Sequence, residues 1–298
     1  MTAGPCPETV DTIATALAWT RLQLEQAGIA ERRLESRLLV ALAVGVSPEY
    51  VFGYPERAID AAARRTLSDV VARRAGREPM AYITGVREFW SLPFAVSPDT
   101  LIPRPDSETL IEAVLERFPD RDGTERLLDL GAGSGCLLLA LLHERRRWTG
   151  TGTDRSVAAL AVAAGNATRL GLADRSDFVR HDWSEVPLSD LGARRFDLLI
   201  ANPPYIADGD VQGLDPDVVD YEPHGALFAG DDGLDDYRAI VPRAATTVRP
   251  GGWVFLEIGQ GQLAAVAAML IDHGYGSIGE RRDLAGIPRC VFGRVGKQ

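Results

Sequence analysis

The chain reads Leu127-Leu128-Asp129-Leu130-Gly131-Ala132-Gly133-Ser134-Gly135 in its central part, a short apolar run followed by a glycine cluster. The apolar run predicts a buried strand, and the glycines predict a sharp turn into a helix. Glycine also lets a ligand approach the backbone closely, and the start of a helix offers unpaired N–H groups. A dinucleotide fingerprint would need glycine where Cys136 stands. The spacing therefore indicates a different nucleotide-like ligand, with Asp129 and residues 131 to 135 as candidate contacts.

From Gly123 onward the sequence alternates between short apolar runs and longer helical patterns. This alternation is typical of a parallel sheet with crossover helices. We predict strands at 126–130, 149–153, 176–180, 196–201 and 252–258, with weaker signals at 276–282 and 289–294. We predict helices at 134–145, 156–170, 235–248 and 262–273. The expected fold is an α/β domain with a seven-stranded, doubly wound sheet.

Two polar groups follow the next strands of this pattern. Asp154 stands at the end of the second strand, where its carboxylate can accept hydrogen bonds from both hydroxyls of a ribose. The alternative is that Asp154 caps the helix that starts near Ser156. Asp182 and Trp183 follow the third strand and offer an acceptor for an adenine amino group and a flat ring beside it.

Asn202-Pro203-Pro204-Tyr205 follows the fourth strand, 196–201. Ligands of open α/β sheets bind at the carboxyl ends of strands. The two prolines fix the backbone and remove two donors, so that the Asn202 oxygen and the Pro203 carbonyl can accept the hydrogens of an NH2 group. Its nitrogen lone pair would then face an electrophile. The alternative is a tight turn that leaves the strand without a chemical role.

The first part of the chain has a different pattern. Helical periodicity over Thr9–Gly28, Ala30–Gly45 and Ile59–Gly76 predicts a small helical domain. Its arginine pairs at 32–33, 64–65 and 73–74 are expected to be solvated helix faces. Residues 86–96 alternate as a β-hairpin does, prolines stiffen 98–105, and a helix is expected from Asp106 to Phe118. The predicted organisation is a helical domain at 1–80, a hairpin connector at 81–105 and the α/β domain at 106–298.

Composition limits the classes of partner that the protein is expected to bind. A net charge of −10 and a pI near 5.0 argue against unaided binding to a phosphate backbone, so we expect no direct nucleic-acid partner. The three cysteines form no pair of metal-ligand spacing and the four histidines are scattered, so no metal is expected. The sequence has no apolar run of membrane-spanning length and no signal-peptide pattern, so we expect no membrane partner and a cytoplasmic location.

The glycine loop, Asp154, Asp182-Trp183 and the 202–205 tetrapeptide together resemble the class I S-adenosylmethionine-dependent methyltransferases. Within that class the chain is similar to the HemK/PrmC family of protein-(glutamine-N5) methyltransferases. The similarity covers nearly the whole length. Its residues are the stretches 78–85, 101–108, 222–227, 230–234 and 283–289 together with the motifs above. Residues 35–39 match the family pattern only loosely.

This resemblance implies methylation of the glutamine in the Gly-Gly-Gln loop of class 1 peptide release factors, with S-adenosylmethionine as cofactor. It also implies that Asn202 touches cofactor and substrate and that Pro203, Pro204 and Tyr205 line the glutamine pocket. Phe89 and Arg104 are candidate wall residues, although both can equally serve hairpin packing. The small N-terminal domain is expected to dock the protein substrate.

Two other functions stay open at this point. Asn-Pro-Pro-Tyr is shared with amino-methyltransferases that modify an exocyclic base nitrogen of RNA or DNA. A non-catalytic cofactor-binding scaffold is the other alternative, although it would have no use for the Asn202 clamp. A glutamine amide is a weak nucleophile, and no nearby Cys or Ser offers covalent help. Catalysis is therefore expected to rest on orientation and electrostatics, without a dedicated general base.

Overall fold

The computed structural model describes residues 5–185, 187, 191 and 196–296. The chain divides into two compact units. The first contains Met1–Gly85 and the short segment Asp215–Tyr221, and the second contains Val86–Leu214 and Glu222–Gln298. Along the described residues, no helix is both long and apolar enough to span a membrane.

The first unit is helical. It contains α1 (Ile13–Gln26), α2 (Arg32–Val44), α3 (Pro48–Gly53), α4 (Ala61–Ala75), α5 (Met80–Thr84) and α9 (Pro216–Tyr221). The side chains of Thr12, Ser47 and Asp60 cap α1, α3 and α4 by accepting from backbone amides. The three long helices occupy the three segments that periodicity predicted. The short helices α3, α5 and α9 were not predicted, because one or two turns show no periodicity.

Arg74 joins the segment 215–221 to the rest of the first unit. Its guanidinium donates to Glu35 Oε2 at 2.8 Å and to Asp217 Oδ2 at 2.7 Å, and its side chain is only 8% exposed. The Tyr221 hydroxyl adds a hydrogen bond to the Gly76 carbonyl at 2.6 Å. The prediction that the arginine pairs are solvated is therefore wrong for Arg74, whose charge is compensated by two carboxylates in a buried position.

The second unit begins with the predicted hairpin, β1 (Val86–Phe89) and β2 (Leu92–Ala95). Trp90 and Ser91 both have positive φ, as the two central residues of a tight hairpin turn require. The Trp90 backbone amide donates to Glu108 and its indole donates to Glu144. These bonds fix the hairpin to α6 (Glu108–Arg117), which follows the 3-10 turn η1 (Pro105–Ser107), and to α7 (Cys136–Glu144).

The sheet of the second unit has seven strands in the order β5-β4-β3-β6-β7-β9-β8. The strands are β3 (Arg126–Leu130), β4 (Thr149–Asp154), β5 (Ser176–Arg180), β6 (Phe196–Ala201), β7 (Val248–Glu257), β8 (Gly276–Arg282) and β9 (Pro288–Arg294). The predicted strand number is confirmed. The sheet is mixed rather than purely parallel, because β9 runs antiparallel to both of its neighbours.

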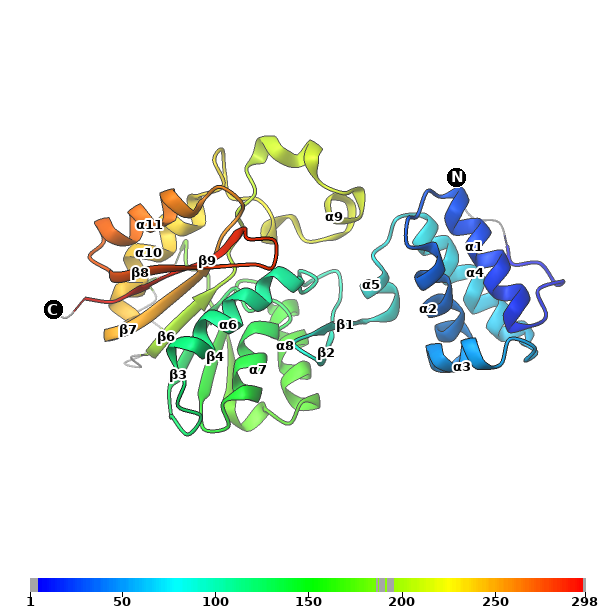
Figure 1. Ribbon diagram of the computed structural model, residues 1–298, viewed down its shortest axis with the longest axis horizontal. Helices are drawn as coiled ribbons and strands as arrows, with labels where there is room; N and C mark the ends of the chain where they lie inside the picture. Colours follow the sequence, from blue (N-terminus) through cyan, green and yellow to red (C-terminus); the bar gives the residue numbers. More distant parts are fainter. Residues whose placement is uncertain (1–4, 186, 188–190, 192–195, 297–298) are drawn as a thin grey trace. The chain divides into compact units, whose positions relative to one another are not determined.

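Helices cover both faces of this sheet (Figure 1). α6, α7 and α8 (Val157–Arg169) pack on one face, whose core includes Leu127 and Leu198. α10 (Asp235–Thr247) and α11 (Leu263–Asp272) pack on the other face, whose core includes Leu128 and Leu199. Neighbouring residues of each central strand thus enter opposite cores, as the alternation of side chains along a strand requires.

The strand order reverses between β3 and β6. From β3 the chain proceeds outward to β4 and β5, and then returns to form β6 and β7 on the other side. Ligands of open α/β sheets bind at this reversal, beyond the carboxyl ends of the strands. The glycine loop after β3, Asp154 at the end of β4 and Asn202 after β6 all lie at that edge.

Candidate active site

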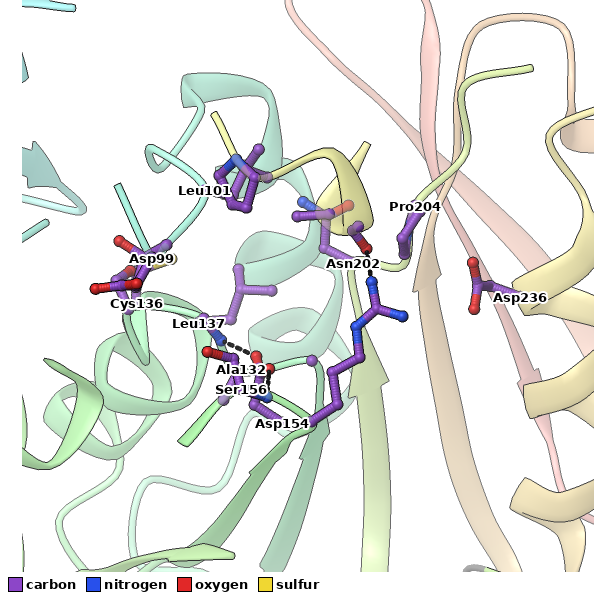
Figure 2. A pocket seen from close by; sticks show the side chains of 18 of the residues that line it. Asp99, Leu101, Ala132, Cys136, Leu137, Asp154, Ser156, Asn202, Pro204 and Asp236 are labelled. Atoms are coloured by element: carbon purple, nitrogen blue, oxygen red, sulfur yellow. Dashed lines mark hydrogen bonds between the residues drawn. The ribbon is translucent and has the colours of Figure 1, made fainter. Parts of the chain in front are cut away.

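A cavity of about 340 Å3 opens at the carboxyl edge of the sheet, within the second unit. Ten of the residues proposed from the sequence line it: Arg104, Gly131, Ala132, Gly133, Ser134, Asp154, Asp182, Trp183, Asn202 and Pro204. Figure 2 shows Asp154, Asn202 and Asp236, which come from three separate elements, around this one cavity. Its size is within the range of small-molecule and cofactor sites.

The glycine loop forms one wall. Gly131 and Gly133 have φ of 76° and 53°, a region that side chains disfavour. The amides of Gly131 and Ala132 both donate to the Thr153 carbonyl at 2.8 Å, which fastens the loop to β4. A methyl group added to Gly133 would have no atom nearer than 4.0 Å, so a ligand has room to approach the backbone there.

Asp154 organises this loop. Its Oδ2 accepts from the Gly133 amide at 3.0 Å and its Oδ1 accepts from the Ser156 amide at 2.8 Å. The helix that follows is capped by Ser156 itself, whose hydroxyl accepts from Ala159. The alternative of Asp154 as the helix cap is thus not what the structure shows. Each carboxylate oxygen keeps a lone pair, so Asp154 can still accept hydrogen bonds from two ribose hydroxyls.

Trp183 and Asp182 form the adjoining wall. The Trp183 ring packs on Gly131, where an added methyl group would lie 3.1 Å from the ring. Its indole donates to Asp236 Oδ1 at 2.8 Å, so a residue at the start of α10 fixes the ring plane. Asp182 accepts from the Ser184 hydroxyl and amide, and this hydrogen bonding lowers the pKa of Asp182. Asp182 therefore stays an ionised acceptor at neutral pH.

Asn202 faces the cavity together with residues that lie before α6. Its Nδ2 donates to the Ser107 hydroxyl at 3.3 Å. Arg104 also lines the cavity and forms an ion pair with Glu222, a buried carboxylate whose second oxygen accepts from the Ile102 amide at 3.1 Å. This pairing fixes the 101–107 stretch against the segment that follows Tyr221.

Five other candidates lie away from the cavity lining. Phe89 is in the core beside Phe94, in keeping with hairpin packing. The Cα side of Gly135 packs closely on Ala163 and Leu139, so it serves the contact of α7 with α8. The remaining three, Asp129, Pro203 and Tyr205, are not among the residues that line this cavity.

Contacts on the side away from the cavity fix Tyr205. Its carbonyl accepts from the Gln262 side chain at 2.9 Å, and its ring packs against the core under α10 and α11. Burial raises the pKa of the Tyr205 phenol to about 12, so this hydroxyl stays protonated at neutral pH. Tyr205 therefore shapes the site and supplies no base.

Asp129 is a buried carboxyl under the glycine loop. It is 1% exposed, and neither of its oxygens has a hydrogen bond of normal geometry. Burial raises the pKa of Asp129 to about 7; the Leu138 amide lowers it in part, and the charge of Asp154 raises it further. The sequence suggested Asp129 as a cofactor contact, but the described structure gives it a place behind the lining.

The raised pKa of Asp129 makes fold stability depend on pH. The unfolded chain releases this proton near pH 4 and the folded chain near pH 7, so the contribution of Asp129 to stability falls across that window. Asp129→Asn removes the titrating carboxyl group, so the stability of the variant does not fall with pH for this reason. Relative to wild type, we expect the variant to gain on the order of 2 to 4 kcal/mol between pH 4 and pH 8, measured by denaturant unfolding without ligand. A difference that does not change with pH would contradict the assignment.

Several contributors could not be identified from the sequence. Ser107, Asp236, Gln262 and Glu222 act on the predicted residues from elements far away in the chain. Only Ser107 and Glu222 lie in stretches that the family resemblance had marked. No cluster of three or more His, Cys, Asp or Glu suited to a metal occurs in the described part of the chain.

Comparison with known proteins shows the family of the chain. A family profile described as the PrmC N-terminal domain matches residues 15–85, and one described as a methyltransferase small domain matches residues 105–215. Release factor glutamine methyltransferase of Bradyrhizobium diazoefficiens is 41% identical, over 97% of this chain and 96% of that protein. The chain belongs to the release factor glutamine methyltransferase family. The members from Cereibacter sphaeroides (42%, over 95% of this chain and 98% of that one) and Geobacter sulfurreducens (39%, over 96% and 97%) are similar along nearly their whole length.

Solved structures that resemble this family member confirm the fold. The hMettl16 catalytic domain in complex with the MAT2A 3'UTR hairpin 1 superposes with a TM-score of 0.58. It is 19% identical and covers 76% of this chain and 80% of its own. The predicted class I methyltransferase fold is thus confirmed, while identity this low says nothing about the substrate.

Proposed function

We propose that this chain transfers a methyl group to the side-chain amide nitrogen of the glutamine in the Gly-Gly-Gln motif of class 1 peptide release factors. The observation that carries this proposal is one cavity lined by both the glycine loop and Asn202 in a member of this family. The proposed substrate is a translation factor, so we place the reaction in the cytoplasm.

The cofactor is S-adenosylmethionine, which when bound supplies a methyl group on a positively charged sulfur. The residues of the cavity fit it. Asp154 keeps acceptors for the ribose hydroxyls, the open space beside Gly133 admits a close approach, and the Trp183 ring offers a flat wall. Asp182 lines the cavity next to Trp183, and as an ionised acceptor it suits the amino group of an adenine.

Asn202 is proposed to orient the glutamine amide. A side-chain amide is a weak nucleophile because its lone pair is delocalised into the carbonyl. An acceptor on its hydrogens increases electron density at nitrogen and fixes the direction of the lone pair. The Asn202 Oδ1 would serve as one acceptor and the Pro203 carbonyl as the other, with Pro204 and Tyr205 shaping the pocket.

The protein groups near the cavity support catalysis by orientation rather than by a base. The phenol of Tyr205 stays protonated, and burial raises the pKa of the Cys136 thiol to about 12. Neither group takes up a proton from an amide at neutral pH. The amide proton is acidic once the nitrogen carries the extra methyl group, so it can leave to water after the transfer.

The alternative, methylation of an exocyclic base nitrogen, has less support. The net charge of −10 does not favour a nucleic-acid backbone. The hMettl16 structure contains RNA, but its 19% identity relates it to this chain by fold alone. Incubation with labelled cofactor, in parallel with a purified release factor, bulk tRNA and DNA, tests the choice. We expect label on the release factor only, and label on a nucleic acid would overturn the proposal.

The helical unit is proposed to dock the release factor. Among the described residues of this unit, five large apolar side chains are exposed, including Phe52 at 77% and Tyr54 at 51%. Phe52 and Tyr54 lie two residues apart, and contiguous exposed apolar groups often mark protein-binding surfaces. Phe52 also stacks under the Arg37 guanidinium, which presents a cation beside the apolar ring.

Replacing both Phe52 and Tyr54 with Ser tests docking in the full-length protein. We expect KM for an intact release factor to rise by roughly tenfold, the scale of losing two aromatic contacts, while kcat and the rate on a short Gly-Gly-Gln peptide stay unchanged. Ile271→Ser is the matched control, because Ile271 is 60% exposed but lies on α11 in the other unit. Equal KM values for the double variant and wild type would exclude these side chains from docking.

A further inference from the structure

Glu257 is a buried carboxyl next to Asn202 for which the proposed reaction so far has no use. It is the last residue of β7, and the strand register pairs Leu256 with Ala201, the residue before Asn202. Glu257 is 2% exposed, and its Oε2 has no hydrogen-bond partner in the described structure. Buried carboxyls with an unpartnered oxygen are rare and call for an explanation.

Ser107 stands between Glu257 and Asn202. It is 3% exposed, and its hydroxyl oxygen accepts from the Asn202 amide at 3.3 Å. Burial raises the pKa of Glu257 to about 7, and hydrogen bonding from Ser107 and then from Asn202 lowers it. Asp106 raises this pKa and Arg289 lowers it through their charges. Three polar side chains, from η1, from the residue after β6 and from the end of β7, thus meet at the cavity wall, with Glu257 behind the two that line it.

The direction of these hydrogen bonds follows from the chemistry of a carboxyl group. An ionised carboxylate can only accept, so Ser107 and Asn202 both donate to Glu257 when it is charged. Ser107 therefore turns its hydrogen toward Glu257 and keeps its lone pairs for the Asn202 NH2 group. Asn202 must then point its nitrogen toward Ser107 and its Oδ1 away from it.

We infer that Glu257 is a positioning residue for methyl transfer: through Ser107 and directly, it holds the NH2 of Asn202 and so leaves Oδ1 to receive the substrate amide. This inference rests on the proposed role of Asn202. Without Glu257 the Ser107 hydroxyl could reverse and donate to Asn202 Oδ1, which would turn a donor toward the substrate NH2. Two donors facing each other would repel.

Preventing this wrong orientation of Asn202 also explains why a carboxyl group occupies this costly buried position. A buried ionisable group without full pairing destabilises a fold, so a purely structural site would be better filled by an apolar residue. Tyr237 fixes the backbone of Glu257, because its hydroxyl donates to the Glu257 backbone carbonyl at 2.8 Å. The backbone from which the carboxyl extends is thereby held in one place relative to the tetrapeptide.

Glu257→Leu removes the acceptor and puts an apolar side chain of similar size in its place. We expect the single-turnover rate of methyl transfer to a release factor to fall roughly tenfold to a hundredfold, the scale of misorientation at a reacting group. Cofactor affinity should change by less than about threefold, because Glu257 does not line the cavity. Glu257→Gln, whose carbonyl still accepts, should recover most of the rate.

A double-variant cycle separates positioning from a structural role. In the Asn202→Ala background, Glu257→Leu should cause no further loss of rate, because its effect is exerted through Asn202. Losses that multiply, or a Glu257→Leu enzyme with the wild-type rate, would overturn the inference while leaving the proposed function intact. Should Glu257→Leu not fold, Ser107→Ala carries the same test, since it breaks the same chain of hydrogen bonds.

The proposed function itself fails by a different result. If wild type transfers no methyl group to the release factor, that function is wrong, and the orientation of Asn202 has no reaction to serve. If Asn202→Ala alone keeps the wild-type rate, the clamp is wrong and Glu257 has nothing to position. Both results also overturn the role of Glu257.

Discussion

Asn202→Ala is expected to lower the rate of methyl transfer by roughly 10²-fold or more while leaving cofactor binding and the fold nearly unchanged. The substitution removes one oriented acceptor whose effect is greatest in the transition state. Asn202 is half-buried and its side chain donates to Ser107 and to Glu257, and losing these two hydrogen bonds should leave the fold intact. Single-turnover assays with saturating cofactor and release factor measure this step without product release.

Asn202→Asp is the finer test of the same clamp. It keeps an acceptor oxygen but adds a charge, and it removes the N–H donor whose hydrogen bond the Ser107 hydroxyl accepts. We expect the rate to fall although the side chain has the same shape, and cofactor affinity to rise because the carboxylate attracts a positive sulfur. A wild-type rate in Asn202→Ala would show instead that the tetrapeptide is only a turn.

Asp154→Ala is expected to weaken cofactor binding by about 1 to 3 kcal/mol, or roughly 5- to 150-fold in Kd. The carboxylate offers acceptors to the ribose and also holds Gly133 and Ser156 by their amides. Calorimetry with S-adenosylmethionine measures the loss directly. Asp174→Ala is the matched control, because it removes an exposed carboxylate on the turn before β5. Equal Kd values for Asp154→Ala and wild type would remove Asp154 from the site.

The sequence was sufficient for the central strands and for the residues that follow them. Strands at 126–130 and 196–201 were predicted with the observed bounds, because buried strands are short apolar runs with polar or glycine ends. Placing Asp154 and Asn202 at one edge then needed only the rule that parallel strands end on the same side. The antiparallel direction of β9 was not predictable, since an apolar run has no signature of direction.

The parts of the site that were missed depend on contacts between distant segments. Ser107 and Glu257 lie 95 residues before and 55 residues after Asn202, and nothing in their local sequence marks them as its neighbours. Arg74 looked like a surface residue in an arginine-rich helix until its two carboxylate partners were known. Tertiary pairing of this kind decides burial and orientation, and periodicity does not record it.

The most direct test of the central claim is to locate the methyl group. The wild-type protein is incubated with isotopically labelled S-adenosylmethionine and a purified class 1 release factor, and the digested product is sequenced by mass spectrometry. We predict a single methyl group on the side-chain nitrogen of the glutamine in the Gly-Gly-Gln motif, and none when Asn202→Ala is used for the same time. A methyl group on another residue, or an unmodified release factor, would contradict the account.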